Sequence, residues 1–289
     1  MIYSMNLLLW GPTLDESFFP TLEEIRNIGF GGVEVPISST NPQFYRSWAD
    51  RLDELGLKRQ ADVICGPDHN LISSDAAMRK ATLEHLHRSV DCAVALGATH
   101  LMGPYHSALG VFTGQPATAD EWKWGVESIQ ILAEYAQQQG IRLGLEYLNR
   151  FEMYLTSCGE ELARFVDDVN HPNCQIMFDT FHANIEEKNI GDTIRQLGDR
   201  ITFVQLSEND RSTPGKGNVA WDSVFQGLRD INYQGWLSIE AFSTKLSVAN
   251  IWRKMFDSEE QLMRDGLGFI QSNWEKQPVS SFVSNGHTA

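Results

Sequence analysis

The sequence predicts a single (β/α)8 barrel, because short apolar runs and longer amphipathic runs alternate eight times along its 289 residues. The apolar runs are nearly continuous, as expected of parallel strands that are buried on both faces. Four later runs end in an oxygen-bearing side chain, at intervals of about one strand–helix unit. A doubly wound open sheet is the alternative, but the first turn, Gly11-Pro-Thr-Leu-Asp15, lacks the glycine-rich phosphate-binding fingerprint.

The strands are expected where a short run of apolar residues is bounded by glycine or polar residues. These runs are residues 6–10, 32–37, 58–65, 100–105, 142–148, 175–181, 201–206 and 236–242. Together they supply the eight strands that a closed barrel needs.

The helices are expected where apolar residues recur at intervals of three and four. Thr118, followed three residues later by Glu121, predicts a capping box at the start of one helix. The helices are expected at residues 21–28, 44–55, 74–96, 119–138, 160–169, 190–197, 221–232 and 259–274. Four glycines are expected to end a helix before the next strand, because glycine adopts a positive φ at little cost. They are Gly29, Gly97, Gly140 and Gly235.

No linker divides the chain, so residues 1–275 are expected to form one domain and the polar residues 276–289 a flexible tail. The 38 acidic and 23 basic residues give a net charge of −15, which disfavours nucleic acid and anionic membranes as partners. No apolar run approaches the roughly 20 residues of a membrane span, and secretion through a signal peptide is not expected. Its four cysteines lack metal-binding spacing, so a cytoplasmic protein with reduced thiols is expected.

The polar strand ends are Glu146, Asp179, Gln205 and Glu240. Consecutive parallel strands bring such positions to one rim of a barrel, where barrel enzymes carry their chemistry. Three carboxylates that meet there would repel one another unless a cation were bound. Carboxylate and amide oxygens suit a hard divalent cation, so these four residues predict a metal site.

Further polar residues lie close to these strand ends in the sequence. Glu152, His182 and Arg211 could hydrogen-bond the hydroxyl and carbonyl oxygens of a polyhydroxylated substrate. Three more candidates for the substrate pocket follow the earlier strands, namely Trp10, His69 and His106. The loop Pro214-Gly-Lys-Gly217 follows the seventh strand, where barrels often bind phosphate. Because a single lysine in a short loop is only a weak signal for phosphate binding, a neutral sugar is favoured.

Two segments resemble the motifs of the ketose 3-epimerases, a group that includes the D-tagatose and D-psicose 3-epimerases of the xylose isomerase-like TIM-barrel superfamily. They are Leu145-Glu-Tyr-Leu-Asn-Arg-Phe-Glu152 and Phe178-Asp-Thr-Phe-His-Ala-Asn-Ile-Glu-Glu187. Ser207-Glu-Asn-Asp-Arg-Ser-Thr-Pro-Gly-Lys-Gly217 and Ile239-Glu-Ala-Phe242 are similar to further blocks in the same order. The resemblance covers about residues 5–275 and is specific from Glu146 onward.

The resemblance implies roles for individual residues. Glu146, Asp179 and Glu240 fall on ligands of one divalent ion, with Mn²⁺ expected before Mg²⁺ or Co²⁺. Glu146 and Glu240 also fall on the catalytic acid/base pair. The substrate-binding groups of the family correspond to Glu152, His182 and Arg211. The resemblance also implies a keto-sugar substrate and a homodimer or homotetramer.

Gln205 departs from the family pattern, which usually has a metal-binding histidine at this position. A glutamine carbonyl can still ligate a cation, although more weakly, and it gives an all-oxygen set. The leading hypothesis is a metal-dependent epimerase or isomerase that moves a proton beside the carbonyl of a keto-sugar through an enediolate, with epimerisation at C3 favoured. Two alternatives stay open: a dehydratase or lyase of a keto-cyclitol or 3-keto-glycoside, and a sugar-binding barrel that has lost catalysis.

Overall fold

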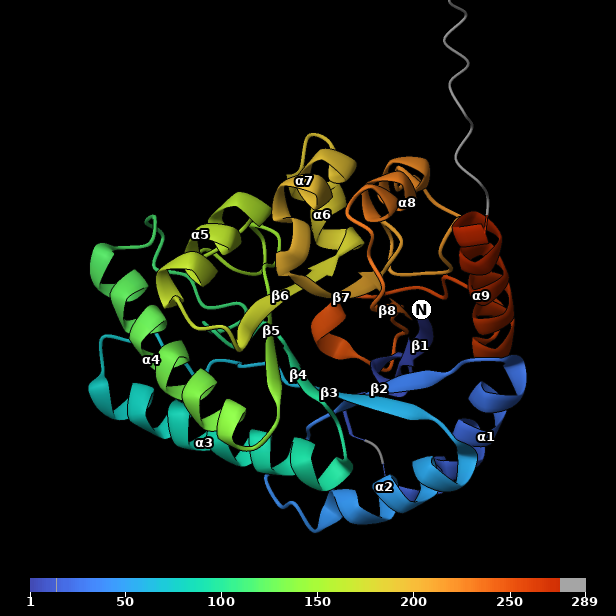
Figure 1. Cartoon of the computed structure of the whole chain (residues 1–289), viewed down its shortest axis with the longest axis horizontal. Helices are drawn as coiled ribbons and strands as arrows, with labels where there is room; N and C mark the ends of the chain where they lie inside the picture. Colours follow the sequence, from blue (N-terminus) through green and yellow to red (C-terminus); the bar gives the residue numbers. More distant parts are fainter. Residues whose placement is uncertain (14, 276–289) are drawn as a thin grey trace, which may run out of the picture.

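The computed structural model describes residues 1–13 and 15–275, and it confirms the eight-stranded barrel. All neighbouring strands are parallel, and β8 pairs with β1 to close the ring. Figure 1 shows the strands around one axis with the helices outside them. The strands are β1 Ile2–Asn6, β2 Gly32–Pro36, β3 Lys58–Asp62, β4 His100–Gly103, β5 Arg142–Glu146, β6 Cys174–Asp179, β7 Ile201–Leu206 and β8 Trp236–Ile239.

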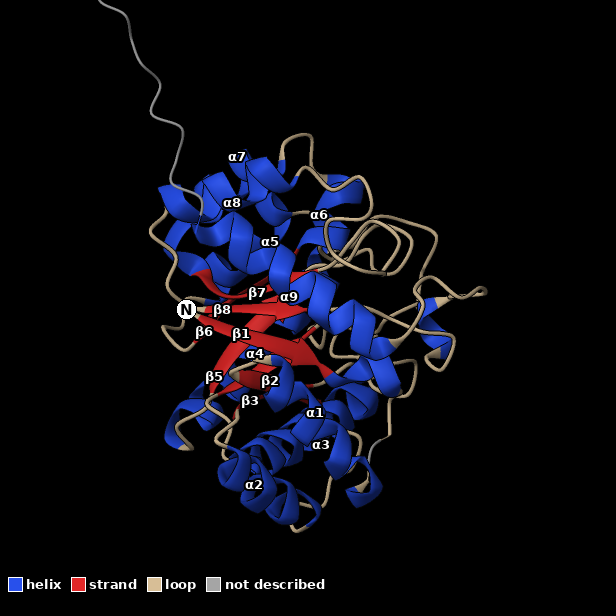
Figure 2. Cartoon of the chain, turned by 90° about the vertical axis from the view of Figure 1, so that its right-hand side faces the viewer, coloured by secondary structure: helices blue, strands red, loops and turns tan. Residues whose placement is uncertain are grey.

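The helices cover the outside of the barrel and bury one apolar face against it. Figure 2 shows the strands in the centre and long loops gathered at one end of them. The helices are α1 Phe19–Ile28, α2 Phe44–Leu55, α3 Ala76–Leu96, α4 Ala119–Gln138, α5 Gly159–Val169, α6 Thr180–Glu186, α7 Ile190–Leu197, α8 Trp221–Asp230 and α9 Glu259–Glu275.

The barrel interior is divided into an apolar layer and a polar layer. Met177, Phe203 and Trp236 occupy matching positions on β6, β7 and β8 and form an apolar cluster with Met102. Two residues further along these strands, Asp179 is the register partner of Gln205. Because alternate residues of a strand point to the same face, Asp179 and Gln205 lie one layer above the apolar cluster. The register therefore places polar side chains at the carboxyl end of the barrel.

The first strand lies earlier than the sequence pattern predicts. The expected strand at residues 6–10 is wrong, because β1 ends at Asn6 and Leu7–Trp10 form a 3₁₀ helix. Leu7, Leu8 and Leu9 are buried in this turn, so the apolar run continues past the strand. Asn6 thus closes a strand, where its side chain belongs to the same rim as the other polar strand ends.

A short helix was also absent from the expected elements. The sixth strand was expected to reach residue 181, but it ends at Asp179, whose carboxylate accepts the Phe181 backbone N–H over 2.7 Å. This N-cap starts α6 directly at the rim. His182 is therefore carried by a helix that begins beside Asp179.

The local helix signals agree with the structure in most places. Thr118 and Glu121 form the predicted capping box of α4. The expected positive φ is found at 119° for Gly29, 75° for Gly97 and 74° for Gly140. It is not found at Gly235, where a side chain would instead collide with the Tyr233 ring.

The described residues form one barrel, and the tail expected at residues 276–289 lies outside them. In residues 1–13 and 15–275, no helix combines the length and the apolar character that crossing a bilayer requires.

Candidate functional site

A pocket opens at the carboxyl ends of the strands, where long loops follow β3, β4, β5 and β8. Its polar wall consists of Asp62, Glu146, Glu152, His182, Arg211 and Glu240. The rest of its wall is apolar and consists of Leu8, Ile64, Pro104, Leu109, Leu148, Phe242, Leu246, Val248 and Ala249. The charged groups therefore converge on one side of a pocket that is otherwise hydrophobic.

The four polar strand ends are all at this rim. Glu146 and Asp179 are the last residues of β5 and β6, Gln205 is the penultimate residue of β7, and Glu240 directly follows β8. All four side chains are buried. Glu146 and Glu240 line the pocket, whereas Gln205 lies below it and contacts Glu34.

Arg211 bridges the carboxylates of this rim. Its Nη1 donates to Asp179 Oδ2 over 2.6 Å, to Ser207 Oγ over 2.9 Å, and to Glu240 at short range. The guanidinium carbon also lies 3.8 Å from the Phe181 ring centroid. The Arg211 backbone has a φ of 61°, an unfavourable value for this residue type, and such strain is typical of functional sites.

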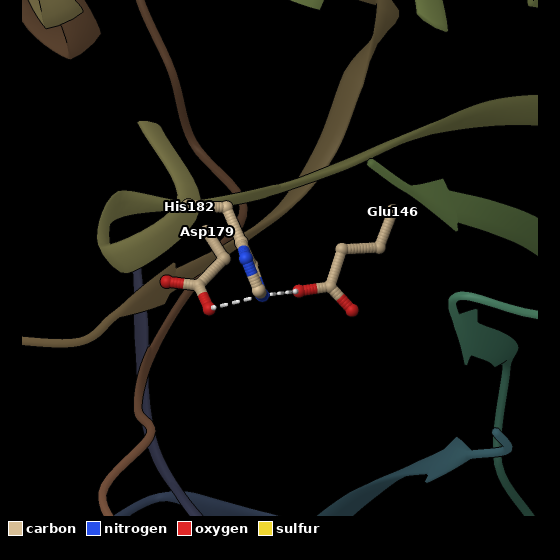
Figure 3. A group of neighbouring side chains, drawn as sticks. All are labelled: Glu146, Asp179 and His182. Atoms are coloured by element: carbon tan, nitrogen blue, oxygen red, sulfur yellow. Dashed lines mark ion pairs between the residues drawn. The ribbon is translucent and has the colours of Figure 1, made fainter. Parts of the chain in front are cut away.

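His182 lies between Asp179 and Glu146, as Figure 3 shows. Its Nε2 is 3.5 Å from Glu146 Oε1 and 3.6 Å from Asp179 Oδ2. Its Nδ1 accepts the Asn149 backbone N–H over 3.0 Å, so a neutral ring carries its proton on Nε2. Arg211 Nη2 is 3.0 Å from the same Nε2, and that contact cannot be a hydrogen bond in this tautomer.

The carboxyl groups of the site differ in the direction of their pKa shifts. Burial, followed by repulsion from Glu240 and Asp179, raises the pKa of Glu146 well above its usual range. Burial likewise raises the pKa of Glu240, even though Arg211 opposes the shift. Burial also acts on Asp179, but the nearby Arg211 charge, helped by the Phe181 backbone N–H, outweighs it and lowers the pKa of that carboxyl. Burial, helped by Arg211, lowers the pKa of His182 to about 3, which keeps the imidazole neutral.

The sequence interpretation missed three residues of this site: Asp62, which lines the pocket, and Asn6 and Glu34, which each contact one of the four polar strand ends. Asn6 Nδ2 donates to Glu240 Oε1 over 3.2 Å and to Glu34 Oε2 over 3.4 Å. Burial, and then the nearby Asp62, raise the pKa of Glu34 to about 8, and burial raises that of Asp62 to about 7. The sequence did carry a signal for Glu34, because it is an acidic residue within an apolar strand, as Glu146 is.

The weaker substrate-binding candidates do not line this pocket. His69 stacks on the His85 ring with a centroid distance of 3.9 Å, and Trp10 packs edge-on against Phe18. His106 is buried against Phe165 and is hydrogen-bonded to a threonine. A role in substrate binding for these three residues remains a prediction.

Glu152 lines the pocket, and its Oε1 accepts from Asn149 Nδ2 over 2.8 Å. The same Asn149 supplies the backbone N–H to His182, so one residue positions two of the predicted substrate-binding groups. Arg150 points away from them and pairs with Glu186. The loop after β5 therefore supports the pocket through Asn149.

The loop of residues 214–217 is folded around a buried carboxylate. Glu208 is fully buried, and its oxygens accept the backbone N–H groups of Gly215 and Val219 over 2.8 and 3.0 Å. Lys216 points outward and pairs with Asp265. Because Glu208 already occupies the backbone donors that a phosphate would use, this loop does not resemble a phosphate site.

A larger cavity of about 420 Å³ lies at the opposite end of the barrel. It is lined by residues that start strands, among them Ile2, His100 and Arg142. Barrel enzymes carry their chemistry at the carboxyl ends of the strands, so the smaller pocket is the candidate active site despite its size.

The described residues could hold a cation at this site. Potential ligand atoms of Glu146, Asp179 and His182 lie within 4.8 Å of one another, and all three residues are buried. The carbonyl oxygen of Gln205 is buried and has no hydrogen-bond partner among the described residues. An unpaired buried acceptor beside clustered carboxylates is what a cation site provides.

Comparison with known proteins agrees with this geometry. Residues 22–273 match the family model described as "Xylose isomerase-like TIM barrel". An L-ribulose 3-epimerase of Methylomonas sp. (strain DH-1) is 33% identical over 78% of this chain and 80% of its own length. A D-psicose 3-epimerase of Agrobacterium fabrum is 33% identical over 85% of this chain and 88% of its own length.

A solved structure gives the same result in three dimensions. The structure of a D-allulose 3-epimerase from Methylomonas sp. in complex with D-allulose has a TM-score of 0.89 and 28% identity, and it covers 94% of this chain and 97% of its own. The expected resemblance to ketose 3-epimerases and the expected isomerase class are confirmed by these relatives. The chain belongs to the xylose isomerase-like TIM barrel family.

Proposed function

We propose that this protein is a divalent-metal-dependent ketose 3-epimerase. One observation carries the proposal: two buried carboxylates, Glu146 at the end of β5 and Glu240 directly after β8, line the same pocket from separate parts of the barrel wall. Inversion at a carbon needs one group to remove a proton and another to return it on the opposite face. The ketose 3-epimerases among the relatives carry out this type of reaction according to their names.

The donor set fits a hard divalent cation, with Mn²⁺ or Mg²⁺ favoured. Glu146, Asp179 and Glu240 offer carboxylate oxygens, and Gln205 offers its unpaired carbonyl oxygen. His182 is close enough to ligate, but its Nε2 carries the proton when Nδ1 accepts from Asn149, so we assign it to the substrate. When bound, the cation would polarise the substrate carbonyl and acidify the neighbouring C–H bond.

The residues of the chain would divide the proton chemistry between them. One of the pair Glu146 and Glu240 removes the proton from C3, which leaves an enediolate, and the other returns a proton to the opposite face. The group that acts as base must be ionised, and a bound cation would favour the ionised carboxylates against the burial that raises the pKa of both groups. Arg211 and the Nε2–H of His182 supply donors for the oxygens that gain negative charge.

The pocket favours an unphosphorylated keto-sugar. Arg211 is the cationic side chain in its described wall, and it is already engaged by Asp179 and Glu240. The wall away from the acids is apolar, and Glu208 occupies the loop donors nearby. A phosphate would therefore meet carboxylates or hydrocarbon instead of a free cation.

Deuterium exchange tests the proposal. The purified chain is loaded with Mn²⁺ and incubated in D₂O with D-psicose or L-ribulose, and the products are followed by NMR. We expect the C3 epimer to form with solvent deuterium at C3 and an unchanged carbon skeleton. Loss of water with a new enone absorbance from a keto-cyclitol would instead support the dehydratase alternative. Absence of exchange with Mn²⁺, Co²⁺ and Mg²⁺ would overturn the proposal.

A further inference from the structure

The amide of Gln205 is held in one orientation by a residue on the other side of the barrel. Gln205 Nε2 donates to Glu34 Oε2 over 2.9 Å, although the two residues are 171 positions apart in sequence. Both side chains are completely buried. This contact leaves Gln205 Oε1 buried and without a hydrogen-bond partner among residues 1–13 and 15–275.

Asn6 fixes the direction of this contact. Its Oδ1 accepts the Leu8 backbone N–H over 2.9 Å, so its Nδ2 must face Glu34 and Glu240. Glu34 Oε2 is therefore an acceptor from Asn6, and it accepts from the amide nitrogen of Gln205 as well. The Gln205 oxygen is turned away from Glu34 as a consequence.

The free oxygen belongs to the layer of the acidic rim. Gln205 is the register partner of Asp179 on the neighbouring strand, and both lie above the apolar cluster of the barrel interior. If the amide turned over, its N–H groups would face the rim, where they would repel a cation. A buried carbonyl without a partner carries a desolvation penalty, which a bound cation would relieve.

We propose that Glu34 is a positioning residue that turns the carbonyl oxygen of Gln205 toward the cation, and that Asn6 ties this arrangement to Glu240. The inference rests on the metal dependence in the proposed function. Glu34 does not itself contact the cation in this scheme, but it decides which end of a neutral ligand is presented. Outer groups that orient a metal ligand typically change metal affinity by about 10–100-fold.

The test measures Mn²⁺ binding to the EDTA-treated full chain by electron paramagnetic resonance. Glu34→Met removes the acceptor at nearly constant volume, whereas the matched variant Glu34→Gln keeps an acceptor oxygen. We expect Glu34→Met to weaken Mn²⁺ binding by about 10–100-fold and Glu34→Gln to stay within about threefold of the unmodified chain. Glu34→Asp, a milder change that cannot reach Gln205, should also lose affinity and serves if Glu34→Met does not fold.

A double variant separates positioning from general damage. In a Gln205→Ala background, Glu34→Met should cause no further loss of Mn²⁺ affinity, because its effect passes through Gln205. Equal losses in both backgrounds, or no loss in the Glu34 variants, would overturn the inference while the proposed function stands. If the unmodified chain binds no Mn²⁺, Mg²⁺ or Co²⁺, the metal-dependent function and this inference both fail.

Discussion

The Arg211 guanidinium donates to Asp179 Oδ2 over 2.6 Å, and the same nitrogen contacts Glu240. One positive charge thus lies between two of the three carboxylates that the resemblance assigns to a cation. Both acids are buried, so their repulsion is poorly screened. Arg211 therefore stabilises the site electrostatically as well as lining the pocket.

Replacing this arginine should destabilise the fold most when no cation is present. We expect Arg211→Met to lower the free energy of unfolding by about 3–5 kcal/mol in EDTA, because buried carboxylates lose their partner. Mn²⁺ should recover more stability in the variant than in the unmodified chain. Urea unfolding with EDTA and with Mn²⁺ measures both effects.

Arg195→Met is the matched control for this prediction. Arg195 also contacts two acids, Asp192 and Asp230, but its ion pairs are exposed. Exposed pairs contribute about 0–1 kcal/mol, so this variant should lose little in either condition. Similar losses for Arg195→Met and Arg211→Met would contradict the electrostatic role of Arg211.

The two proposed acid/base residues can be distinguished by single substitutions. If Glu146 and Glu240 act on opposite faces of C3, Glu240→Gln should block epimerisation, with kcat falling by at least about 100-fold. The remaining carboxylate should still exchange deuterium into one of the two epimers. Glu146→Gln should show exchange in the other epimer only, as NMR in D₂O would reveal.

Two controls accompany this experiment. Mn²⁺ content must be compared, because both residues are also proposed ligands. Glu260→Gln on the exposed face of α9 should leave exchange unchanged. Loss of exchange into both epimers in each variant, with Mn²⁺ retained, would show that the residues do not divide the two faces.

The sequence predicted which carboxylates lie at the rim better than it predicted where their strands end. Glu146 and Asp179 are the last residues of β5 and β6, whereas these strands were expected to reach residues 148 and 181. Asn6 was misplaced at the start of a strand because the leucines that follow it are buried in a 3₁₀ turn. Local hydrophobicity reports burial, and burial alone does not distinguish a strand from a packed turn.

The contacts beneath the pocket could not be predicted from local patterns. The hydrogen bonds from Gln205 and Asn6 to Glu34 depend on how the barrel closes. The position of Arg211 is equally nonlocal, because a loop with a positive φ turns it back over Phe181 and Asp179. The motif predicted which residues matter, whereas the closed barrel determines which of them touch.

Stability should fall in mild acid because His106 is buried as a neutral ring. Burial lowers its pKa to about 3, and its Nδ1 has no partner among the described residues. The unfolded chain takes up a proton near pH 6.5, so stability is fully present above that pH and is lost as pH falls toward 3. Between pH 7 and pH 5 this one residue should account for about 2 kcal/mol of lost stability.

Urea unfolding at both pH values tests this with two variants. His106→Gln should reduce the pH-dependent loss by about 2 kcal/mol, because glutamine does not titrate. Phe165→Leu removes part of the ring that packs on His106. It should lower stability by a similar amount at pH 7 and pH 5. An unchanged pH dependence in His106→Gln would exclude His106 as the source.

The apolar wall should discriminate against phosphorylated ketoses. Val248 lies at the pocket mouth and is 52% exposed, so a lysine there could reach a substrate phosphate. We expect the unmodified chain to prefer the free sugar by about 100-fold in kcat/KM, because a phosphate would be desolvated without a cationic partner. Val248→Lys should narrow this preference by about 10-fold, as one ion pair of about 1.4 kcal/mol implies. The control Val94→Lys adds the same charge at a 42% exposed site on α3 and should leave the preference for the free sugar unchanged. If Val94→Lys narrowed the preference as much as Val248→Lys, net charge and not the pocket wall would set it.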